Sequence, residues 1–413
     1  MNTSDPTGAA LPADALERLR APATAAVETG DIPGVVALVW QGGRTLDLHA
    51  AGVADVATRR PLERSAIFPI ASMSKPVTVA AALRLLEQGK LRLEDAITKW
   101  VPEFAEMRVL KRAGGPLDET YPAPRAITIE DLMTHRSGLT YGFTSRGPLA
   151  NALLETLGYG LHSPLDPNAW ISALAGFPLA SAPGERFEYG HSIDVLGFIV
   201  GRAAGTSFQQ ALRDELLDPL GMTDTGFWVP PATRDRLVVN TLSRAPGDFM
   251  SAPIPGYTAP EPPAYASGGQ GLVSTAVDYL AFARMLLRGG EMPDGRLLRP
   301  ETVQLMTTNR LTAEQRQQTL MGMPIFANGG LGLGVSVVMD AQGHAVRGVG
   351  EAGAFSWPGA YGGWWLADPA KDRVLIWLQD CLPPPPTDGQ LPHLPGAAGV
   401  LDFQRAAYAA IDG

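Results

Sequence analysis

The sequence predicts an α+β fold in which both ends of the chain contribute strands to one antiparallel sheet and the middle contributes helices. Near the N-terminus, apolar runs at 34–41 and 44–51 flank a pair of glycines and predict a β-hairpin. Near the C-terminus, runs at 361–367 and 373–379 flank a short polar turn and predict a second hairpin. Because both hairpins can pair in one sheet with helices on its faces, this arrangement is the most economical one.

Helix signals occupy much of the remaining chain. An apolar run of helical character follows Ser72. A capping box at 128–131 opens a short helix, and residues 208–217 predict another. Residues 275–278 open a further helix, which ends at Leu287 before two glycines.

The proline-rich stretch 245–263 predicts a loop and a domain boundary. We therefore expect a sheet domain formed by residues 1–95 and 265–413, and a mostly helical domain formed by residues 96–264. A functional site is expected in the cleft between the two domains, where small-molecule sites commonly lie.

Composition excludes several classes of function. The chain has 413 residues, is 45% hydrophobic and 18% charged, and carries a formal charge of -9, which disfavours a nucleic-acid partner. It has no apolar run long enough to span a membrane and no N-terminal secretion signal, so we expect a cytoplasmic protein without a membrane partner. The single cysteine, Cys381, excludes an internal disulfide and a thiolate metal cluster.

Neither a metal nor another cofactor is predicted. No two histidines have the spacing of a metal-ligand pair. Residues 348–353 match the pattern G-x-G-x-x-G, but Trp357 and Pro358 follow where a dinucleotide site would need a helix.

The most informative feature is the pattern Ser72-Met73-Ser74-Lys75 at the start of a predicted helix. Three residues apart on a helix, Ser72 and Lys75 share one face, so the amine is within reach of the hydroxyl. A serine hydroxyl is a weak nucleophile unless a neighbouring base removes its proton. The backbone N–H groups at a helix start also favour negative charge that develops beside Ser72.

Further motifs follow in a fixed order. They are Leu132 to Leu139 (LMTHRSGL), Tyr189 to Ser192 (YGHS), Pro219 to Thr225 (PLGMTDT), Gly268 to Thr275 (GGQGLVST) and Trp357 to Gly359 (WPG). Together with the serine-lysine pattern they resemble the serine β-lactamase / penicillin-binding protein superfamily over about residues 25–380. Within it the chain looks most like the family VIII carboxylesterases, relatives of class C β-lactamases that cleave esters.

The resemblance implies roles for particular residues. Ser72 would be the acylated nucleophile, and Lys75 with Tyr189 would form the base. A tyrosine can act as a base when a neighbouring ammonium stabilises its phenolate. The oxyanion hole would consist of the backbone N–H groups of Ser72 and Ala360.

The chain departs from the β-lactamase pattern at two places. Where those enzymes have Tyr-x-Asn, this chain has Tyr189-Gly190-His191, and where they have Lys-Thr-Gly it has tryptophan, proline and glycine at 357–359. An indole suits an uncharged acyl or aryl group but leaves a substrate carboxylate unpaired. The residues expected to bind substrate are Trp357, Gly359, His191, Tyr141 and Asp194.

We therefore expect a serine carboxylesterase that hydrolyses short-chain or aryl esters through an acyl-enzyme. The alternatives that use the same site are a β-lactamase, a D-amino-acid peptidase or amidase, and an acyltransferase. A non-catalytic protein on a penicillin-binding fold is disfavoured, because serine, lysine and tyrosine are all present. The natural ester, its chain length, the stereoselectivity and the oligomeric state are left open by the sequence.

Overall fold

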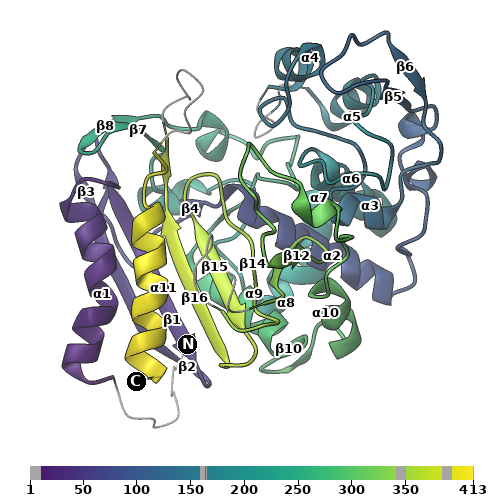
Figure 1. The fold of residues 1–413 in the computed structure, drawn as a ribbon. Helices are drawn as coiled ribbons and strands as arrows, with labels where there is room; N and C mark the ends of the chain where they lie inside the picture. The colour runs from purple at the N-terminus through teal and green to yellow at the C-terminus, as the bar shows by residue number, and fades with distance from the viewer. Residues whose placement is uncertain (1–10, 159–162, 164, 341–349, 384–392, 413) are drawn as a thin grey trace.

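The computed structural model of the chain describes residues 11–158, 163, 165–340, 350–383 and 393–412. At its centre is an eight-stranded sheet in which all neighbouring strands run antiparallel. In spatial order its strands are β12 (Gly329–Leu331), β13 (Ser336–Val338), β14 (Phe355–Ser356), β15 (Trp364–Asp368), β16 (Arg373–Gln379), β1 (Gly34–Gln41), β2 (Arg44–Asp55) and β3 (Arg60–Pro61). Since β1 pairs with both β2 and β16, strands from the two ends of the chain lie side by side, as the sequence predicts (Figure 1).

The helices and the shorter strands surround this sheet. The α-helices of the described residues are α1 (Ala13–Glu28), α2 (Ser74–Glu87), α3 (Ile129–Met133), α4 (Pro148–Leu157), α5 (Pro167–Ala175), α6 (Ser192–Ala204), α7 (Phe208–Leu212), α8 (Asp218–Leu220), α9 (Ala276–Leu287), α10 (Pro300–Met306) and α11 (Ala397–Asp412). The remaining strands are β4 (Phe68–Pro69), β5 (Arg108–Leu110), β6 (Thr120–Pro122), β7 (Thr241–Ala245), β8 (Asp248–Ser251), β9 (Val273–Ser274), β10 (Glu291–Met292), β11 (Gly295–Arg296) and β17 (Cys381–Leu382).

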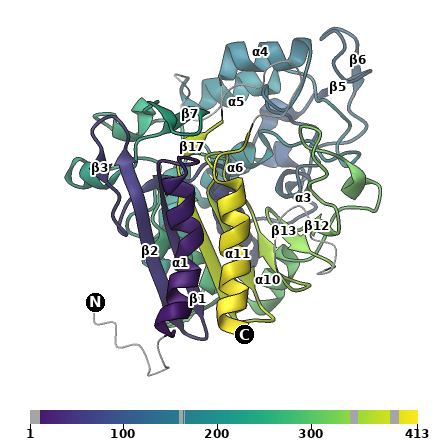
Figure 2. The ribbon, with the colours of Figure 1, turned by 60° about the vertical axis from the view of Figure 1, so that its left-hand side comes forward.

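Strand β1 is apolar along its length because both faces of the sheet are covered. Val35 and Val39 belong to the apolar cluster under α1 and α11, the two helices that lie across one face (Figure 2). Val36 and Leu38 point the other way, into the main core, where α9 packs on β16. Successive side chains of a strand point to opposite faces, so a strand between two covered faces needs no polar alternation.

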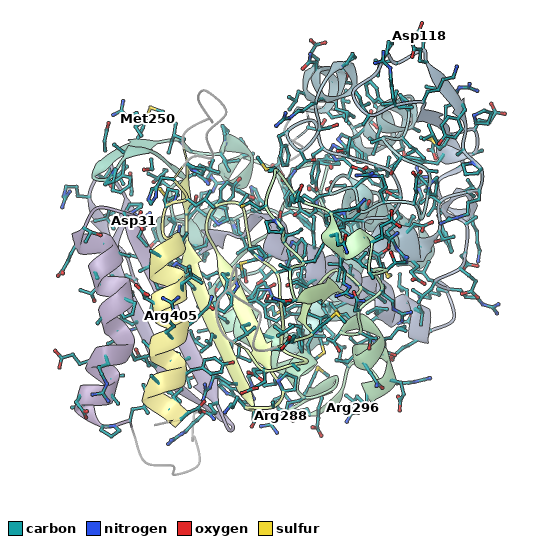
Figure 3. The ribbon with its side chains drawn as sticks, viewed as in Figure 1. Asp31, Asp118, Met250, Arg288, Arg296 and Arg405 are labelled. Carbon is teal, nitrogen blue, oxygen red and sulfur yellow. The ribbon has the colours of Figure 1, made fainter. Side chains whose placement is uncertain are left out.

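The middle of the chain supplies most of the helices that lie away from the sheet. Helices α4, α5 and α6 gather with the hairpin of β5 and β6 at the upper right of Figure 1. Asp118 marks the outer edge of this part, on the side opposite to Arg405 of α11 (Figure 3). The mixed α+β fold with a helical insertion is thus the predicted one, and the domain borders at 95 and 264 stay a prediction.

Several local predictions need correction. The stretch 245–263 is not simply a loop, because β8 lies in it and pairs with β7, which in turn pairs with β17 near the C-terminus. The predicted helix 208–217 continues from α7 into a π-helix at Arg213–Leu217. The C-terminal hairpin begins at Trp364, later than predicted, because the residues before it form a turn.

The described ranges contain neither a membrane-spanning helix nor a cluster of metal ligands. No helix there is long and apolar enough to cross a membrane. No group of three or more histidine, cysteine, aspartate and glutamate side chains there could hold a metal ion. Of the G-x-G-x-x-G match, Gly348 and Val349 lie outside the described residues, and the described remainder leads into the strand β14.

Candidate active site

Ser72 lies in a tight turn at the start of α2. The turn is a single 3-10 turn, Ala71–Met73, that runs directly into the helix. Ala71 has a left-handed φ of 43°. Because a residue other than glycine adopts this conformation at a cost, the surroundings must hold the turn in place. The hydroxyl of Ser74 does so by donating to the Ala71 carbonyl at 2.7 Å, while the Leu272 N–H donates to the Ser74 hydroxyl at 3.1 Å.

Lys75 contacts the Ser72 hydroxyl from the first turn of α2. Its Nζ lies 3.2 Å from Ser72 Oγ and donates a second hydrogen bond to the Gly269 carbonyl at 2.7 Å. The side chain is fully buried. The spacing of three residues therefore places amine and hydroxyl together, as the sequence predicts.

Tyr189, which is 117 residues from Ser72 in the sequence, contacts the same hydroxyl. Its phenol donates to Ser72 Oγ at 2.8 Å, and Lys75 Nζ lies 4.6 Å from its ring centroid. Gly190 permits this approach, since a Cβ there would come within 2.3 Å of the Leu139 carbonyl oxygen. Ser72 Oγ thus has both a lysine and a tyrosine within hydrogen-bond distance.

A buried polar layer lies beneath this trio. The carboxylate of Asp194 contacts the Tyr141 phenol at 3.2 Å, His191 Nδ1 at 3.1 Å, the Ser267 hydroxyl at 2.5 Å and the Gly269 N–H at 3.0 Å. Tyr141, His191 and Asp194 are each at most 1% exposed. Their burial favours a role in positioning over direct contact with a substrate.

The electrostatics of Asp194 favour its ionised form. Burial raises the pKa of this carboxyl, but the hydrogen bond and charge of His191, the Ser267 hydroxyl and the charge of Lys75 together lower it further. The net pKa of Asp194 therefore lies below its usual value. An ionised carboxylate can only accept hydrogen bonds, so Nδ1 of His191 carries the proton that it shares.

His135 was given no role by the sequence, yet it packs directly against the site. Its ring centroid lies 4.8 Å from that of Tyr189, and the backbone at His135 has a left-handed φ of 53°. Burial and, less strongly, the charge of Lys75 hold the pKa of His135 well below its usual value. The imidazole is therefore neutral, and within the described part of the chain neither ring nitrogen has a hydrogen-bond partner.

Trp357 packs against Tyr189 and is almost fully buried. Its ring centroid lies 5.8 Å from that of Tyr189, and its side chain is 3% exposed. The apolar cluster around it includes Phe187, Phe326 and Leu331. The indole therefore makes this side of the trio apolar, although most of its own surface is covered.

Gly359 brings the segment after Trp357 against the turn that carries Ser72. Its N–H donates to the Gly363 carbonyl at 2.7 Å, which closes a turn before β15. A Cβ at Gly359 would lie 2.6 Å from the Ile70 carbonyl oxygen. The next residue, Ala360, is exposed, and its part in an oxyanion hole stays a prediction.

Three residues around the site received no role from the sequence analysis: Ser267, Gly269 and His135. Ser267 precedes the motif at 268–275, and Gly269 lies within it. Their contacts with Lys75 and Asp194 use a hydroxyl and backbone groups, and a single sequence does not show which hydroxyl or backbone group makes such a contact. His135 lies within the motif at 132–139. The sequence alone does not distinguish a buried neutral histidine at this position from an exposed histidine at the end of a helix.

Comparisons with known proteins show the family to which the chain belongs. The family model described as Beta-lactamase matches residues 19–398. Protein Rv1367c of Mycobacterium tuberculosis is 45% identical over 356 residues, which cover 86% of this chain and 87% of the relative. Esterase EstB of Burkholderia gladioli is 33% identical over 395 residues, covering 91% of this chain and 93% of the relative.

The fold of the chain also resembles that of a solved structure. That structure is described as EstCE1, a hydrolase with promiscuous acyltransferase activity, and matches with a TM-score of 0.78 at 27% identity. The match covers 95% of this chain and 98% of that one.

The close approach at Gly359 can be tested by adding one methyl group. We expect Gly359→Ala to lower the free energy of unfolding by about 1–3 kcal/mol, because the new Cβ must displace the Ile70 carbonyl. Urea unfolding measures this loss. The matched control is Gly226→Ala, whose Cβ would have no neighbour closer than 3.9 Å. Equal stability of the two variants would contradict the tight contact.

Proposed function

The chain belongs to the beta-lactamase family, and from this premise we propose that it is a serine carboxylesterase of the family VIII type. Its fold and its relation to Esterase EstB support the broader class, a serine hydrolase. The observation that carries the proposal is the double contact at Ser72 Oγ, which has both Lys75 Nζ and the Tyr189 phenol within hydrogen-bond distance. The proposed substrates are small-molecule esters with short acyl chains or aryl groups.

In the structure Tyr189 is a phenol that donates to Ser72 Oγ. In the proposed reaction this phenol proton first leaves to solvent, and the phenolate that remains removes the proton of Ser72 Oγ. The oxygen then attacks the ester carbonyl carbon, and the backbone N–H groups of Ser72 and Ala360 donate to the oxyanion that forms. Tyr189 gives its proton to the departing alkoxide, which leaves an acyl group on Ser72. Water attacks this acyl-enzyme in the same manner, and the carboxylic acid departs.

Lys75 has an electrostatic part in this scheme. Its Nζ lies 4.6 Å from the Tyr189 ring centroid, close enough for an ammonium to stabilise a phenolate. The hydrogen bond to the Gly269 carbonyl fixes the amine while the proton moves between serine and tyrosine.

The surroundings of Trp357 favour an ester over a β-lactam or a peptide. A substrate that bears a carboxylate needs a cation on the strand segment beside the nucleophile. Trp357 and its apolar neighbours offer no charge there, and a buried unpaired carboxylate is costly. His191, which replaces the amide of the β-lactamase pattern, contacts Asp194 inside the protein.

An acyltransferase is the second candidate. EstCE1, which shares the fold, is described as a hydrolase with promiscuous acyltransferase activity. In this chain the same acyl-enzyme would then pass its acyl group to an alcohol instead of water. We propose hydrolysis as the main reaction, in a protein of the cytoplasm, and the formation of a new ester from added alcohol would identify transfer.

Ser72 is expected to be the sole nucleophile. A fluorophosphonate should add one label to the peptide that contains Ser72, and Ser72→Ala should abolish both labelling and ester hydrolysis. Mass spectrometry of the digested protein locates the label. Ser74→Ala is the control, since Ser74 stabilises the turn without being the proposed nucleophile. A label on another residue, or full activity of Ser72→Ala, would contradict the proposal.

Lys75 and Tyr189 should act as one unit. Lys75→Ala and Tyr189→Phe are each expected to lower kcat on the order of 10²-fold or more, which is a general-base contribution. The double variant should be little worse than either single one, because removing either partner disables both. Steady-state kinetics on a nitrophenyl ester give kcat for wild type, the two single variants and the double variant. Losses that multiply fully would show that the two side chains act independently.

Trp357 should set the preference for uncharged substrates. Wild type is expected to hydrolyse nitrophenyl butyrate far faster than a chromogenic cephalosporin, because the cephalosporin carboxylate would be left unpaired beside Trp357. Each 1.4 kcal/mol of transition-state binding lost in this way lowers the rate about tenfold. Trp357→Lys should shift the ratio of the two kcat/KM values toward the cephalosporin. Trp357→Leu is the control, because it removes the indole without adding charge. A wild type equally fast on both substrates would overturn this preference in favour of a β-lactamase.

A further inference from the structure

Tyr189 is held less directly by regular structure than the two residues it works with. Ser72 lies in the turn that opens α2, and Lys75 lies on the first turn of that helix. Tyr189 instead lies in an irregular segment that ends where α6 begins, at Ser192. Its phenol nevertheless donates to Ser72 Oγ at 2.8 Å. Because precise placement of reacting groups is a large part of catalysis, other contacts must fix the backbone of this tyrosine.

The carbonyl of Tyr189 accepts hydrogen bonds from one neighbouring turn. The Thr144 hydroxyl donates to it at 2.8 Å, and the Tyr141 N–H donates to it at 3.4 Å. A distance of 3.4 Å is longer than the usual N–H···O bond, whereas 2.8 Å is typical of a bond from a hydroxyl. The Thr144 side chain is therefore the main donor to this carbonyl.

The Thr144 hydroxyl joins its own turn to Tyr189. A hydroxyl carries one proton, so it donates along one bond at a time. Its other acceptor, the Tyr141 carbonyl, lies at 3.2 Å, which is farther than the Tyr189 carbonyl. The same oxygen accepts from the Tyr141 N–H at 3.3 Å. One side chain thus accepts from the turn and donates to the segment that carries the phenol.

The turn that carries Thr144 is itself fixed by the helix α4. The Thr144 N–H donates to the Tyr141 carbonyl at 3.2 Å, which closes the turn. Gly142 lies inside this turn, and a Cβ there would lie 2.5 Å from Leu154 Cγ on α4. The backbone of the turn therefore packs directly on that helix. A chain of contacts runs from α4 through the turn to Tyr189.

The ring of Tyr189 has contacts of its own, but they are of a different kind. Its centroid lies 4.8 Å from that of His135 and 5.8 Å from that of Trp357. Apolar contacts are not directional, so they limit the space around the ring without fixing the phenol oxygen along a line. The hydrogen bond from Thr144 adds the directional contact, and it acts on the backbone from which the ring extends.

We propose that Thr144 is a positioning residue for Tyr189, whose hydroxyl holds the Tyr189 carbonyl and thereby keeps the phenol within hydrogen-bond distance of Ser72 Oγ. The inference rests on the proposed function, in which Tyr189 exchanges a proton with Ser72. Within the described residues the Thr144 hydroxyl has hydrogen-bond partners only in Thr140 and in the backbone of Tyr141 and Tyr189. It therefore acts through the backbone and not on the reacting atoms.

Thr144→Val tests this role, because valine has nearly the shape of threonine and lacks the hydroxyl. We expect kcat for a nitrophenyl ester to fall about ten- to hundredfold, since a displacement of about 1 Å can cost on the order of 10²-fold in rate. KM should stay close to its wild-type value, because the hydroxyl contacts no substrate in this scheme. Thr144→Ser keeps the hydroxyl and should restore most of kcat. Steady-state kinetics give both constants.

Thr307→Val is the matched control. Thr307 is half-buried like Thr144, and its hydroxyl also donates to a backbone carbonyl, that of Val303 at 3.0 Å. This variant loses the same group from α10 and should keep kcat near the wild-type value. Urea unfolding of both valine variants compares their losses of stability, so that a loss of kcat can be read at similar stability.

A double-variant cycle with Tyr189→Phe separates positioning from a general loss of structure. In the Tyr189→Phe background no phenol remains to be placed, so adding Thr144→Val should lower kcat little further. A variant that merely loosens the site would lower kcat in both backgrounds. Thr144→Ala serves the same cycle if the valine variant does not fold.

The outcomes are distinct. A loss of kcat in Thr144→Val that is absent from the Tyr189→Phe background, and that Thr144→Ser restores, supports the proposal. An equal loss in both backgrounds, or a wild-type kcat in Thr144→Val, overturns it. Full activity of Ser72→Ala or of Tyr189→Phe would instead overturn the proposed function itself.

Discussion

The site depends on burying the amine of Lys75 beside the Ser72 hydroxyl. In water the amine would be charged and remote from any serine, whereas on the first turn of α2 its Nζ lies 3.2 Å from Ser72 Oγ. Burial of an ammonium is opposed by several kcal/mol of lost hydration, so the surrounding groups must compensate. The Gly269 carbonyl, the faces of two tyrosine rings and the ionised carboxylate of Asp194 do this. The polar layer and the glycine contacts can be understood as consequences of that one burial.

Glycines let three separate segments converge on Ser72. At Gly190, Gly269 and Gly359 a Cβ would lie no more than 2.6 Å from a neighbouring atom. Each contact fixes one partner: Tyr189 above the lysine, the carbonyl that accepts from it, and the turn that precedes Ala360. Close backbone approach gives positional precision without extra side chains, and precise placement of reacting groups is a large part of enzymatic rate enhancement. The segments are anchored by regular elements, since Ser72 leads into α2, Tyr189 precedes α6 and Gly359 precedes β15.

The sequence could predict what is local and could not predict what is assembled from distant segments. The pairing of Ser72 with Lys75 follows from helix geometry alone, and both terminal hairpins follow from apolar runs around turns. Tyr189 is 117 residues from Ser72, and only the resemblance singled it out. The strand β8 was missed although its partner β7 is its neighbour in sequence, because the proline-rich composition of 245–263 predicts a loop. Ser267 and the backbone of Gly269 were missed for a different reason, since their roles exist only once three segments meet around Asp194.

The two departures from the β-lactamase pattern act together on the charge of the site. Tryptophan in place of lysine removes a cation from the segment beside Ser72, while histidine in place of asparagine gives Asp194 an additional donor. With one cation fewer, Lys75 is left as the amine beside the reacting atoms, and its Nζ contacts Ser72 Oγ and the Gly269 carbonyl. A site arranged in this way lacks a second cation for a carboxylated substrate and retains what a neutral ester needs, which is a serine with a base and a pair of backbone donors.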